Sequence, residues 1–299
     1  MHNERAMIDS HVHFYTEADL EKVAGKLPYT LPKPHSLTDY LAQLSKNNVL
    51  PRFLNNVHLS ILPDSENVFA SFEELKDLQA RDPATYSGIR LVGTIKADPA
   101  YATQARLAHP QVAGIRIVLH DAKPGSVRNG AYSDTAWNAL YDRLRDHQHV
   151  HVYAQEAETN LRVLRQIPRH VRVMIDHLGS CHASRGAEEE AYVSLLREAR
   201  ERGNVWFKGP GYRTSTDVEK VLPFASRLIS ELGAGKLILE ATDAPHVGAD
   251  SDGSDFARSF DTAGAFGFVQ DLAERLSVKC AIPAGQILSG AAAEIFNFD

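Results

Sequence analysis

Acid–base side chains occur at alternate positions near the N-terminus, in the segment Asp9-Ser10-His11-Val12-His13. Side chains of a β-strand alternate between its two faces, so Asp9, His11 and His13 are predicted to project to the same side. Burying a carboxylate and two imidazoles together costs free energy, so a fold that buries them is expected to use them for a function. The spacing therefore predicts a catalytic role for His11 and His13, and an ordinary polar strand end is the alternative.

Two further polar residues, His177 and Asp243, each follow an apolar, β-branched run. Barrel enzymes carry their catalytic groups at the C-terminal ends of the strands, so separate strands would bring these residues to one mouth with the two histidines. A single histidine or aspartate at the end of a strand could equally be a capping or turn residue. Asp176 is predicted to cap the following helix and is left out of the site, whereas His246 either orients Asp243 or completes its turn.

The elements that must position these residues are short apolar runs that alternate with longer stretches of helical period. The candidate strands are 6–13, 56–62, 90–96, 114–119, 149–154, 171–176, 204–208 and 236–242, and helical patterns include 137–147, 189–202 and 218–232. Eight such units predict one α/β domain over residues 1–299, a (β/α)8 TIM barrel, for which about 250 residues suffice. A doubly wound open sheet is the competitor, but its Gly-rich turn after the first strand is replaced by Asp-Ser-His-Val-His. The Pro-rich stretch 26–34 is interpreted as a loop.

Composition excludes several classes of protein. The chain is 43% hydrophobic and 23% charged with a net charge of −6, which predicts a large core and no nucleic-acid partner. Cys181 and Cys280 form neither a disulfide framework nor a metal-binding spacing, so a reducing, cytoplasmic location is expected. No run approaches the roughly 20 apolar residues of a membrane span, so no membrane partner is expected.

Three segments with sequences IDSHVH (8–13), IDHLG (175–179) and ATDAPH (241–246) occur in this order at barrel-like spacing. Together they resemble the amidohydrolase-related (amidohydrolase 2) lactonase branch of the amidohydrolase superfamily, which includes 2-pyrone-4,6-dicarboxylate lactonase and sugar-acid lactonases. The resemblance covers nearly the whole chain and includes a closing helix at 287–298. It implies a hydrolase for a small carboxylated lactone of the sugar-acid, pyrone or muconolactone type.

The resemblance implies that Asp243 is the general base on water, while His11, His13 and His177 polarise the lactone carbonyl and stabilise the oxyanion. It implies hydrolysis without a metal, because the branch includes metal-free enzymes. Many metal-dependent relatives have a histidine at the end of strand five, whereas His151 lies earlier in that segment. The alternative is a Zn²⁺ ion bound by His11, His13, His177 and Asp243.

Substrate recognition is assigned to two arginines and two tyrosines. Arg116 lies in an apolar run and needs an anion, either a substrate carboxylate or a protein partner such as Asp9 or Glu156. The resemblance implies that Arg213 binds a substrate carboxylate and that Tyr29 and Tyr153 contact substrate. Simple packing is the alternative for both tyrosines.

One departure from the dicarboxylate lactonase concerns the number of substrate carboxylates. That enzyme has a second basic residue shortly after the strand-four arginine, whereas this chain has His120 there. A lactone with a single carboxylate therefore fits at least as well.

Three other functions are compatible with these residues. A zinc-dependent decarboxylase or C–C hydrolase on the same barrel would show stoichiometric zinc and sensitivity to chelation. A lactone isomerase would use the same base to move an acyl group within a sugar diacid. A non-catalytic binding protein on a degenerate barrel would bind without turnover, but the presence of both Asp243 and its histidine partners argues against it.

Overall fold

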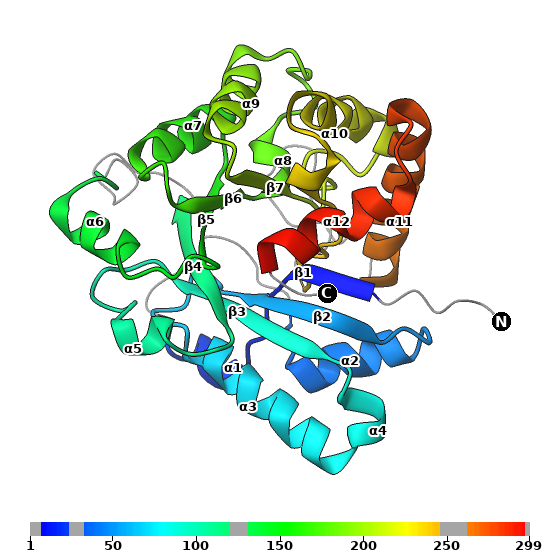
Figure 1. Ribbon diagram of the computed structural model, residues 1–299. Helices are drawn as coiled ribbons and strands as arrows, with labels where there is room; N and C mark the ends of the chain where they lie inside the picture. The colour runs from blue at the N-terminus through cyan, green and yellow to red at the C-terminus, as the bar shows by residue number, and fades with distance from the viewer. Residues whose placement is uncertain (1–6, 24–32, 120–130, 246–261, 297–299) are drawn as a thin grey trace.

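Eight parallel strands in the order β1 to β8 form a nearly closed barrel, with helices packed around it (Figure 1). The computed structural model describes residues 7–23, 33–119, 131–245 and 262–296. Every neighbouring strand pair is parallel, as expected when helical segments connect successive strands. The predicted (β/α)8 TIM barrel is confirmed.

The strands are β1 (Met7–Val12), β2 (Pro51–Val57), β3 (Arg90–Lys96), β4 (Val112–Leu119), β5 (His149–Ala154), β6 (Arg172–Ile175), β7 (Val205–Lys208) and β8 (Leu237–Ile238). The helices are α1 (Glu17–Leu20), α2 (Leu37–Ser45), α3 (Glu66–Arg81), α4 (Pro83–Tyr86), α5 (Gln104–Leu107), α6 (Thr135–Tyr141), α7 (Ala157–Gln166), α8 (His177–Ser180), α9 (Glu190–Arg202), α10 (Val218–Leu232), α11 (Thr262–Cys280) and α12 (Ala284–Phe296), with a 3₁₀ turn η2 at Ala234–Lys236.

The second strand lies earlier in the chain than predicted, at Pro51–Val57 rather than 56–62. Proline is tolerated at the first residue of a strand, so Pro51 begins β2 instead of excluding it. The buried Asn55 and Asn56 interrupt the apolar pattern, and each donates from Nδ2 to a partner, Ser10 O and Ser71 Oγ respectively. The predicted helix 137–147 is also wrong in extent, because α6 ends at Tyr141.

The barrel closes through irregular backbone pairing between β1 and the segment after β8. Ser10 N donates to Glu240 O at 2.9 Å, Asp243 N to His11 O at 2.7 Å and His13 N to Ala244 O at 2.8 Å. The predicted strand 236–242 is therefore regular only at Leu237–Ile238. These hydrogen bonds join the backbone of His11 directly to that of Asp243, and the backbone of His13 to that of Ala244.

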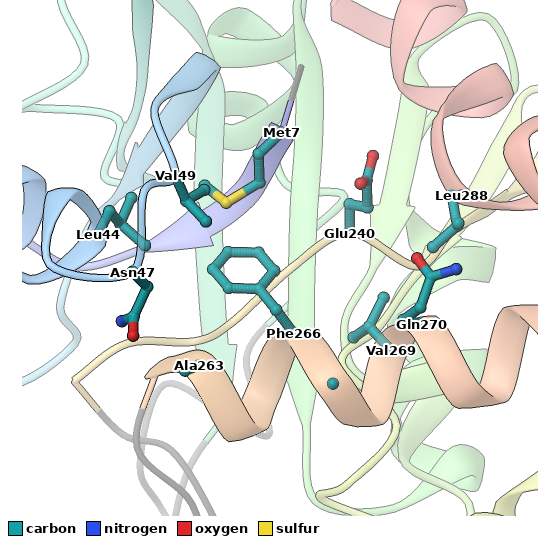
Figure 2. Close-up of a pocket in the computed structure, with 11 residues that line it drawn as sticks. Met7, Leu44, Asn47, Val49, Glu240, Ala263, Phe266, Val269, Gln270 and Leu288 are labelled. Atoms are coloured by element: carbon teal, nitrogen blue, oxygen red, sulfur yellow. The ribbon is translucent and has the colours of Figure 1, made fainter. Parts of the chain in front are cut away.

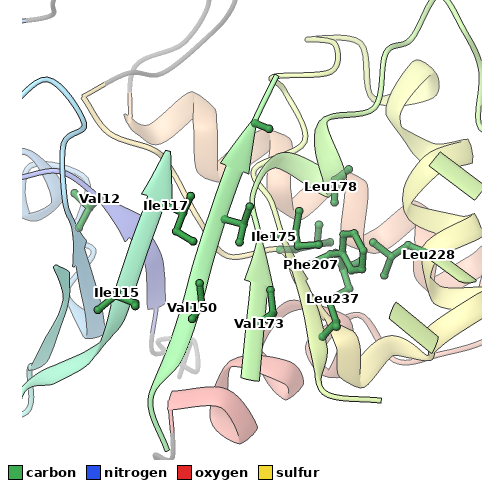
Figure 3. Packing of buried hydrophobic residues seen from close by; sticks show 14 of the residues in the cluster. Val12, Ile115, Ile117, Val150, Val173, Ile175, Leu178, Phe207, Leu228 and Leu237 are labelled. Carbon is green, nitrogen blue, oxygen red and sulfur yellow. The ribbon is translucent and has the colours of Figure 1, made fainter. Parts of the chain in front are cut away.

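Two apolar layers support the barrel. Strand residues such as Val12, Ile115, Val150 and Ile175 pack outward in a cluster that includes the helix residue Leu228 (Figure 3). The barrel interior is filled by a second cluster from the strands and α12, composed of Ile8, Phe53, Val92, Ala113, Met174, Trp206, Ile238, Ala291, Ala292, Ile295 and Phe296. Residues of this interior cluster precede the polar residues along β1 and β6, so the polar groups lie toward the C-terminal ends of the strands.

Both cysteines are free, and Cys181 is buried. Among the described helices, none combines the length and the apolar character needed to cross a bilayer.

Candidate active site

A β-bulge lies between Asp9 and Val12, in the stretch of β1 that contains His11. Asp9 pairs with Leu54 but Val12 pairs with Asn56, so three steps along β1 match two along β2. The Asp9 carboxylate accepts hydrogen bonds from Tyr40 Oη at 2.5 Å and from the backbone N of Thr242 at 3.0 Å. The prediction that Asp9 shares a face with the histidines is wrong, because the extra residue changes the alternation. Burial raises the pKa of Asp9 to about 6.

His11, His13 and Asp243 converge at the mouth of the barrel, as predicted from their places at strand ends. The two imidazole Nε2 atoms lie 3.1 Å apart, and each lies 3.3 Å from Asp243 Oδ1. All three side chains are buried. Burial lowers the pKa of both histidines, which favours their neutral forms.

The hydrogen-bond partner of His13 determines which of its ring nitrogens is protonated. Nδ1 lies 2.6 Å from Val57 O, and a carbonyl oxygen only accepts, so Nδ1 carries the proton. Neutral His13 therefore presents a lone pair at Nε2 toward Asp243. A lone pair beside a carboxylate oxygen is suited to receive a proton or to bind a metal ion.

Asp243 is bound on its other oxygen by Arg213. Arg213 Nε donates to Oδ2 at 2.8 Å, and Nη2 donates to the same oxygen. Burial by itself would raise the pKa of Asp243, but Arg213, followed by the histidines, lowers it well below the usual range. Asp243 also has a left-handed φ of 54°. Such backbone strain is concentrated at functional sites.

His177 begins a left-handed turn at the end of β6. His177, Leu178, Gly179 and Ser180 have φ values of 49°, 54°, 86° and 60°. Asn160 Nδ2 donates to Gly179 O at 3.1 Å and stabilises the turn. The surrounding structure therefore maintains a conformation that residues other than glycine rarely adopt.

The His177 ring lies between two other site residues. Its centroid is 5.7 Å from the stacked His11 ring and 5.0 Å from the edge-on Tyr153 ring. Burial lowers the pKa of His177 to about 4, so the ring is neutral near pH 7. The structure thus brings Tyr153 and all four predicted catalytic residues together.

Asp176 was missed by sequence reasoning. It makes no side-chain cap on the following turn, so the predicted capping role is wrong. Its buried carboxylate lies 2.9 Å from Arg116 Nη2, 2.5 Å from His151 Nε2 and 3.6 Å from Lys208 Nζ. Burial would raise its pKa, but His151 and the other neighbours lower it well below the usual range.

His151 and Lys208 were also missed. His151 lies in the middle of β5 and is the direct neighbour of Arg116 on β4. The site therefore includes residues that lie before the C-terminal ends of these strands. Lys208 is fully buried at the end of β7, and its Nζ donates to Ser10 O at 3.1 Å. A lysine that ends an apolar strand carries the same sequence signal that identified Arg116.

Arg116 forms an ion pair within the protein, but with Asp176 instead of Asp9 or Glu156. Its Nη1 also donates to His58 O at 2.7 Å. Its buried Nε has no hydrogen-bond partner within the part of the chain that the structure describes. Arg116 thus has one N–H group that makes no hydrogen bond within the described residues.

Two groups of side chains have the ligand types and spacing for a metal ion among the described residues: His11, His13 and Asp243, and His11, His151 and Asp176. His177 belongs to neither group, which differs from the predicted ligand set. Arg116 and Lys208 already neutralise the second group. The first group presents imidazole nitrogens and a carboxylate oxygen, which are ligands that zinc accepts.

Three residues considered from the sequence, Tyr29, His120 and His246, lie outside the described residues.

A cavity of about 320 Å³ lies away from this site, between β1, α2 and α11 (Figure 2). Met7, Val49 and Phe266 line it, with Glu240 at one side. It contains none of the predicted site residues.

Solved structures of similar fold include two probable 2-pyrone-4,6-dicarboxylic acid hydrolases. The enzyme from Acinetobacter baumannii, with citric acid bound, is 16% identical at a TM-score of 0.72 and is covered over 98% of this chain and 99% of its own. The enzyme from Pseudomonas putida is 24% identical at a TM-score of 0.70, over 98% of each chain. The 5-carboxyvanillate decarboxylase from Sphingomonas paucimobilis is 12% identical at a TM-score of 0.60, over 98% of this chain and 99% of its own.

No curated protein matches the chain. The model of the amidohydrolase family, however, matches residues 8–281, which is most of the sequence. The order of the histidine and aspartate segments and the barrel that unites them agree with this match. The chain therefore belongs to the amidohydrolase family.

Proposed function

We propose that this protein is a hydrolase that opens a small carboxylated lactone. The observation that carries the proposal is the convergence of Asp243 Oδ1 with the Nε2 atoms of His11 and His13, at 3.3 Å from each, beside Arg213. The carboxylate base, two imidazoles that can accept protons, and a guanidinium that can bind an anionic substrate thus lie together at the C-terminal end of the barrel. The similar structures assigned to 2-pyrone-4,6-dicarboxylic acid hydrolases, one of them with citric acid bound, support a carboxylated substrate.

In the proposed reaction, Asp243 removes a proton from water as the water oxygen bonds to the lactone carbonyl carbon. The developing oxyanion is stabilised by hydrogen-bond donors such as neutral His177. The proton passes from Asp243 to His11 or His13, whose imidazolium then donates to the oxyanion. The oxyanion then re-forms the carbonyl as the bond between the carbonyl carbon and the ring oxygen breaks, and the imidazolium gives its proton to the ring oxygen, which leaves as a hydroxyl group.

Substrate recognition in this proposal uses Arg116, Arg213, Tyr153 and Tyr29. Arg213 is 14% exposed at its side chain, so it can turn part of its guanidinium toward a substrate carboxylate while it remains beside Asp243. Arg116 offers its remaining N–H group from the barrel wall. Tyr153, packed on His177, limits the space next to the carbonyl.

A zinc-dependent decarboxylase or C–C hydrolase is the second candidate, because one observation favours it. Neutral His13 presents a lone pair at Nε2, and the three atoms of the His11, His13 and Asp243 group lie close enough to bind one ion. When bound there, zinc would act as a Lewis acid and would supply an activated water molecule. Arg213 would still bind the substrate carboxylate.

Two measurements on the purified protein test the proposal. Its metal content is determined, and hydrolysis of a panel of carboxylated lactones is followed before and after chelation. We expect ring opening by metal-free protein. Stoichiometric zinc with chelator-sensitive activity would support the second candidate, and no ring opening of any lactone in either form would reject the proposal.

A further inference from the structure

The carboxylate of Asp9 accepts four hydrogen bonds, although its side chain is fully buried. Oδ1 lies 3.1 Å from the backbone N of His11 and 3.0 Å from the backbone N of Thr242. Oδ2 accepts from Tyr40 Oη and from Thr242 Oγ1, each at 2.5 Å. Such donors offset the hydration that a buried carboxylate loses. They come from three parts of the chain, namely β1, α2 and the segment after β8.

Thr242 connects Asp9 to the backbone on both sides of Asp243. Its N donates to Asp9 Oδ1, and its hydroxyl donates to Asp9 Oδ2 while it accepts a hydrogen bond from Ala244 N at 3.1 Å. Between these bonds, Asp243 N donates to His11 O at 2.7 Å. The N–H groups of three consecutive residues, 242 to 244, are therefore bonded to β1, either directly or through the Thr242 hydroxyl.

The backbone held in this way has a conformation that an aspartate rarely adopts. The φ of Asp243 is 54°, in the left-handed region that is unfavourable for residues with a Cβ. Such a conformation persists only where the surrounding structure enforces it. The direction of the Asp243 side chain depends on this φ, and in this direction Oδ1 lies 3.3 Å from Nε2 of both His11 and His13.

We propose that Asp9 is a positioning residue that maintains the left-handed backbone of Asp243 and thereby holds the Asp243 carboxylate against His11 and His13. The Asp9 carboxylate also accepts from His11 N, so one side chain fixes the backbone on both sides of this contact. Asp9 acts through its hydrogen bonds and takes no part in proton transfer. The inference rests on the proposed function only for its effect on turnover.

Asp9→Leu tests the inference, because leucine has the same branched shape but accepts no hydrogen bond. In a crystal structure of this variant, we expect Asp243 to leave the left-handed region and Oδ1 to move away from the two imidazoles. A displacement of about 1 Å can lower a rate about 100-fold, so we expect kcat to fall by about this factor. KM should change little, because the contacts of Arg116 with Asp176 and His58 are unaltered. An Asp243 that keeps its φ and both distances would overturn the inference.

Thr242→Val is a milder variant, because valine keeps the shape of the side chain and the backbone bond to Asp9 Oδ1. It removes the hydroxyl that joins Asp9 Oδ2 to Ala244 N. The backbone of Asp243 should shift in the same direction, with a smaller fall in kcat than in Asp9→Leu. If Asp9→Leu does not fold, the crystal structure of Thr242→Val decides, and an unchanged Asp243 in it would overturn the inference.

Asp9→Asn separates hydrogen bonding from charge. Its Oδ1 can still accept from the backbone N atoms of His11 and Thr242, and its Nδ2 can donate to the hydroxyl oxygens of Tyr40 and Thr242. We expect Asp243 to stay in place and most of the kcat lost in Asp9→Leu to be recovered. A fall in kcat as large as in Asp9→Leu would show that the negative charge is required and would contradict a positioning role.

Gln148→Met is the matched control for the loss of a buried hydrogen-bonding side chain. Gln148 is buried, and its Nε2 donates to Leu107 O at 2.9 Å and to Val112 O at 2.8 Å, at the N-terminal end of β4. This variant should lower the free energy of unfolding without moving Asp243 or changing kcat. An equal fall in kcat in Gln148→Met and Asp9→Leu would overturn the inference. The crystal structures need no substrate, so they decide the inference even if the lactonase proposal fails.

Discussion

The guanidinium of Arg213 binds the carboxylate of Asp243 through Nε at 2.8 Å and through Nη2, both on Oδ2. The other oxygen of Asp243 faces His11 and His13. The two oxygens of this carboxylate thus have different surroundings, one cationic and one composed of neutral imidazoles. In the proposed function, Arg213 therefore couples the acid–base behaviour of Asp243 to the recognition of an anionic substrate.

Replacing Arg213 with methionine should change both properties. Arg213 lowers the pKa of Asp243, so its removal raises that pKa. Because the base must be ionised, the acid limb of the pH profile of kcat/KM should move to higher pH. KM should rise for carboxylated lactones and change little for neutral ones. Arg185→Met removes an exposed arginine bound to Glu156 and Glu189, and it should alter neither property.

Asp243→Asn should abolish most turnover while substrate binding persists. The change keeps the shape of the side chain and removes the base, and general-base catalysis typically contributes about 10²- to 10⁴-fold to the rate. Calorimetry with a carboxylated lactone would measure the affinity, and steady-state kinetic assays would measure kcat. Near-normal kcat in this variant would contradict the assignment of the base.

Gly179→Ala should destabilise the turn that positions His177. Gly179 has a φ of 86°, and an added Cβ would lie 3.1 Å from side-chain atoms of both Leu195 and Phe207. Gly186, with a φ of 78° and no atom within 4 Å of an added Cβ, is the matched control for backbone strain alone. Thermal unfolding should show a loss of about 1 kcal/mol for Gly186→Ala and a larger loss for Gly179→Ala. Only the latter should also lower kcat, and equal losses of stability would exclude the packing contribution.

His35 should contribute to the acid sensitivity of the fold. It is buried against Phe14 and Tyr40, and burial lowers its pKa from 6.5 to about 4. The unfolded state therefore binds more protons between these pH values, so this contribution to stability is present above pH 6.5 and is lost as pH falls toward 4.

His35→Phe removes the titrating group and keeps an aromatic ring. As the pH falls below 6.5, the unfolding free energy of the variant should increase relative to that of the original protein, by an amount on the order of 3 kcal/mol. Urea unfolding over a pH series would measure it. A difference that does not vary with pH would show that His35 does not titrate in this range.

The order of the elements and the residues at their ends followed from the sequence by itself. Period-two and helical patterns predicted eight strand–helix units, and parallel strands in a barrel place their C-terminal ends at one mouth. His11, His13, His177 and Asp243 could therefore be assigned to one site before their distances were known. β3, β5 and α10 also have the predicted limits.

Strand register and the contacts between side chains on different strands became known only from the tertiary structure. The bulge on β1 turned Asp9 away from the histidines, because the register against β2 is set by pairing and not by the period of β1 alone. The packing of neighbouring strands brought His151 and Lys208 to Asp176, although no pattern within the three separate segments showed that these residues would meet. A sequence pattern reports which face of its own strand a side chain occupies, whereas its depth and partners depend on the packing of all eight strands.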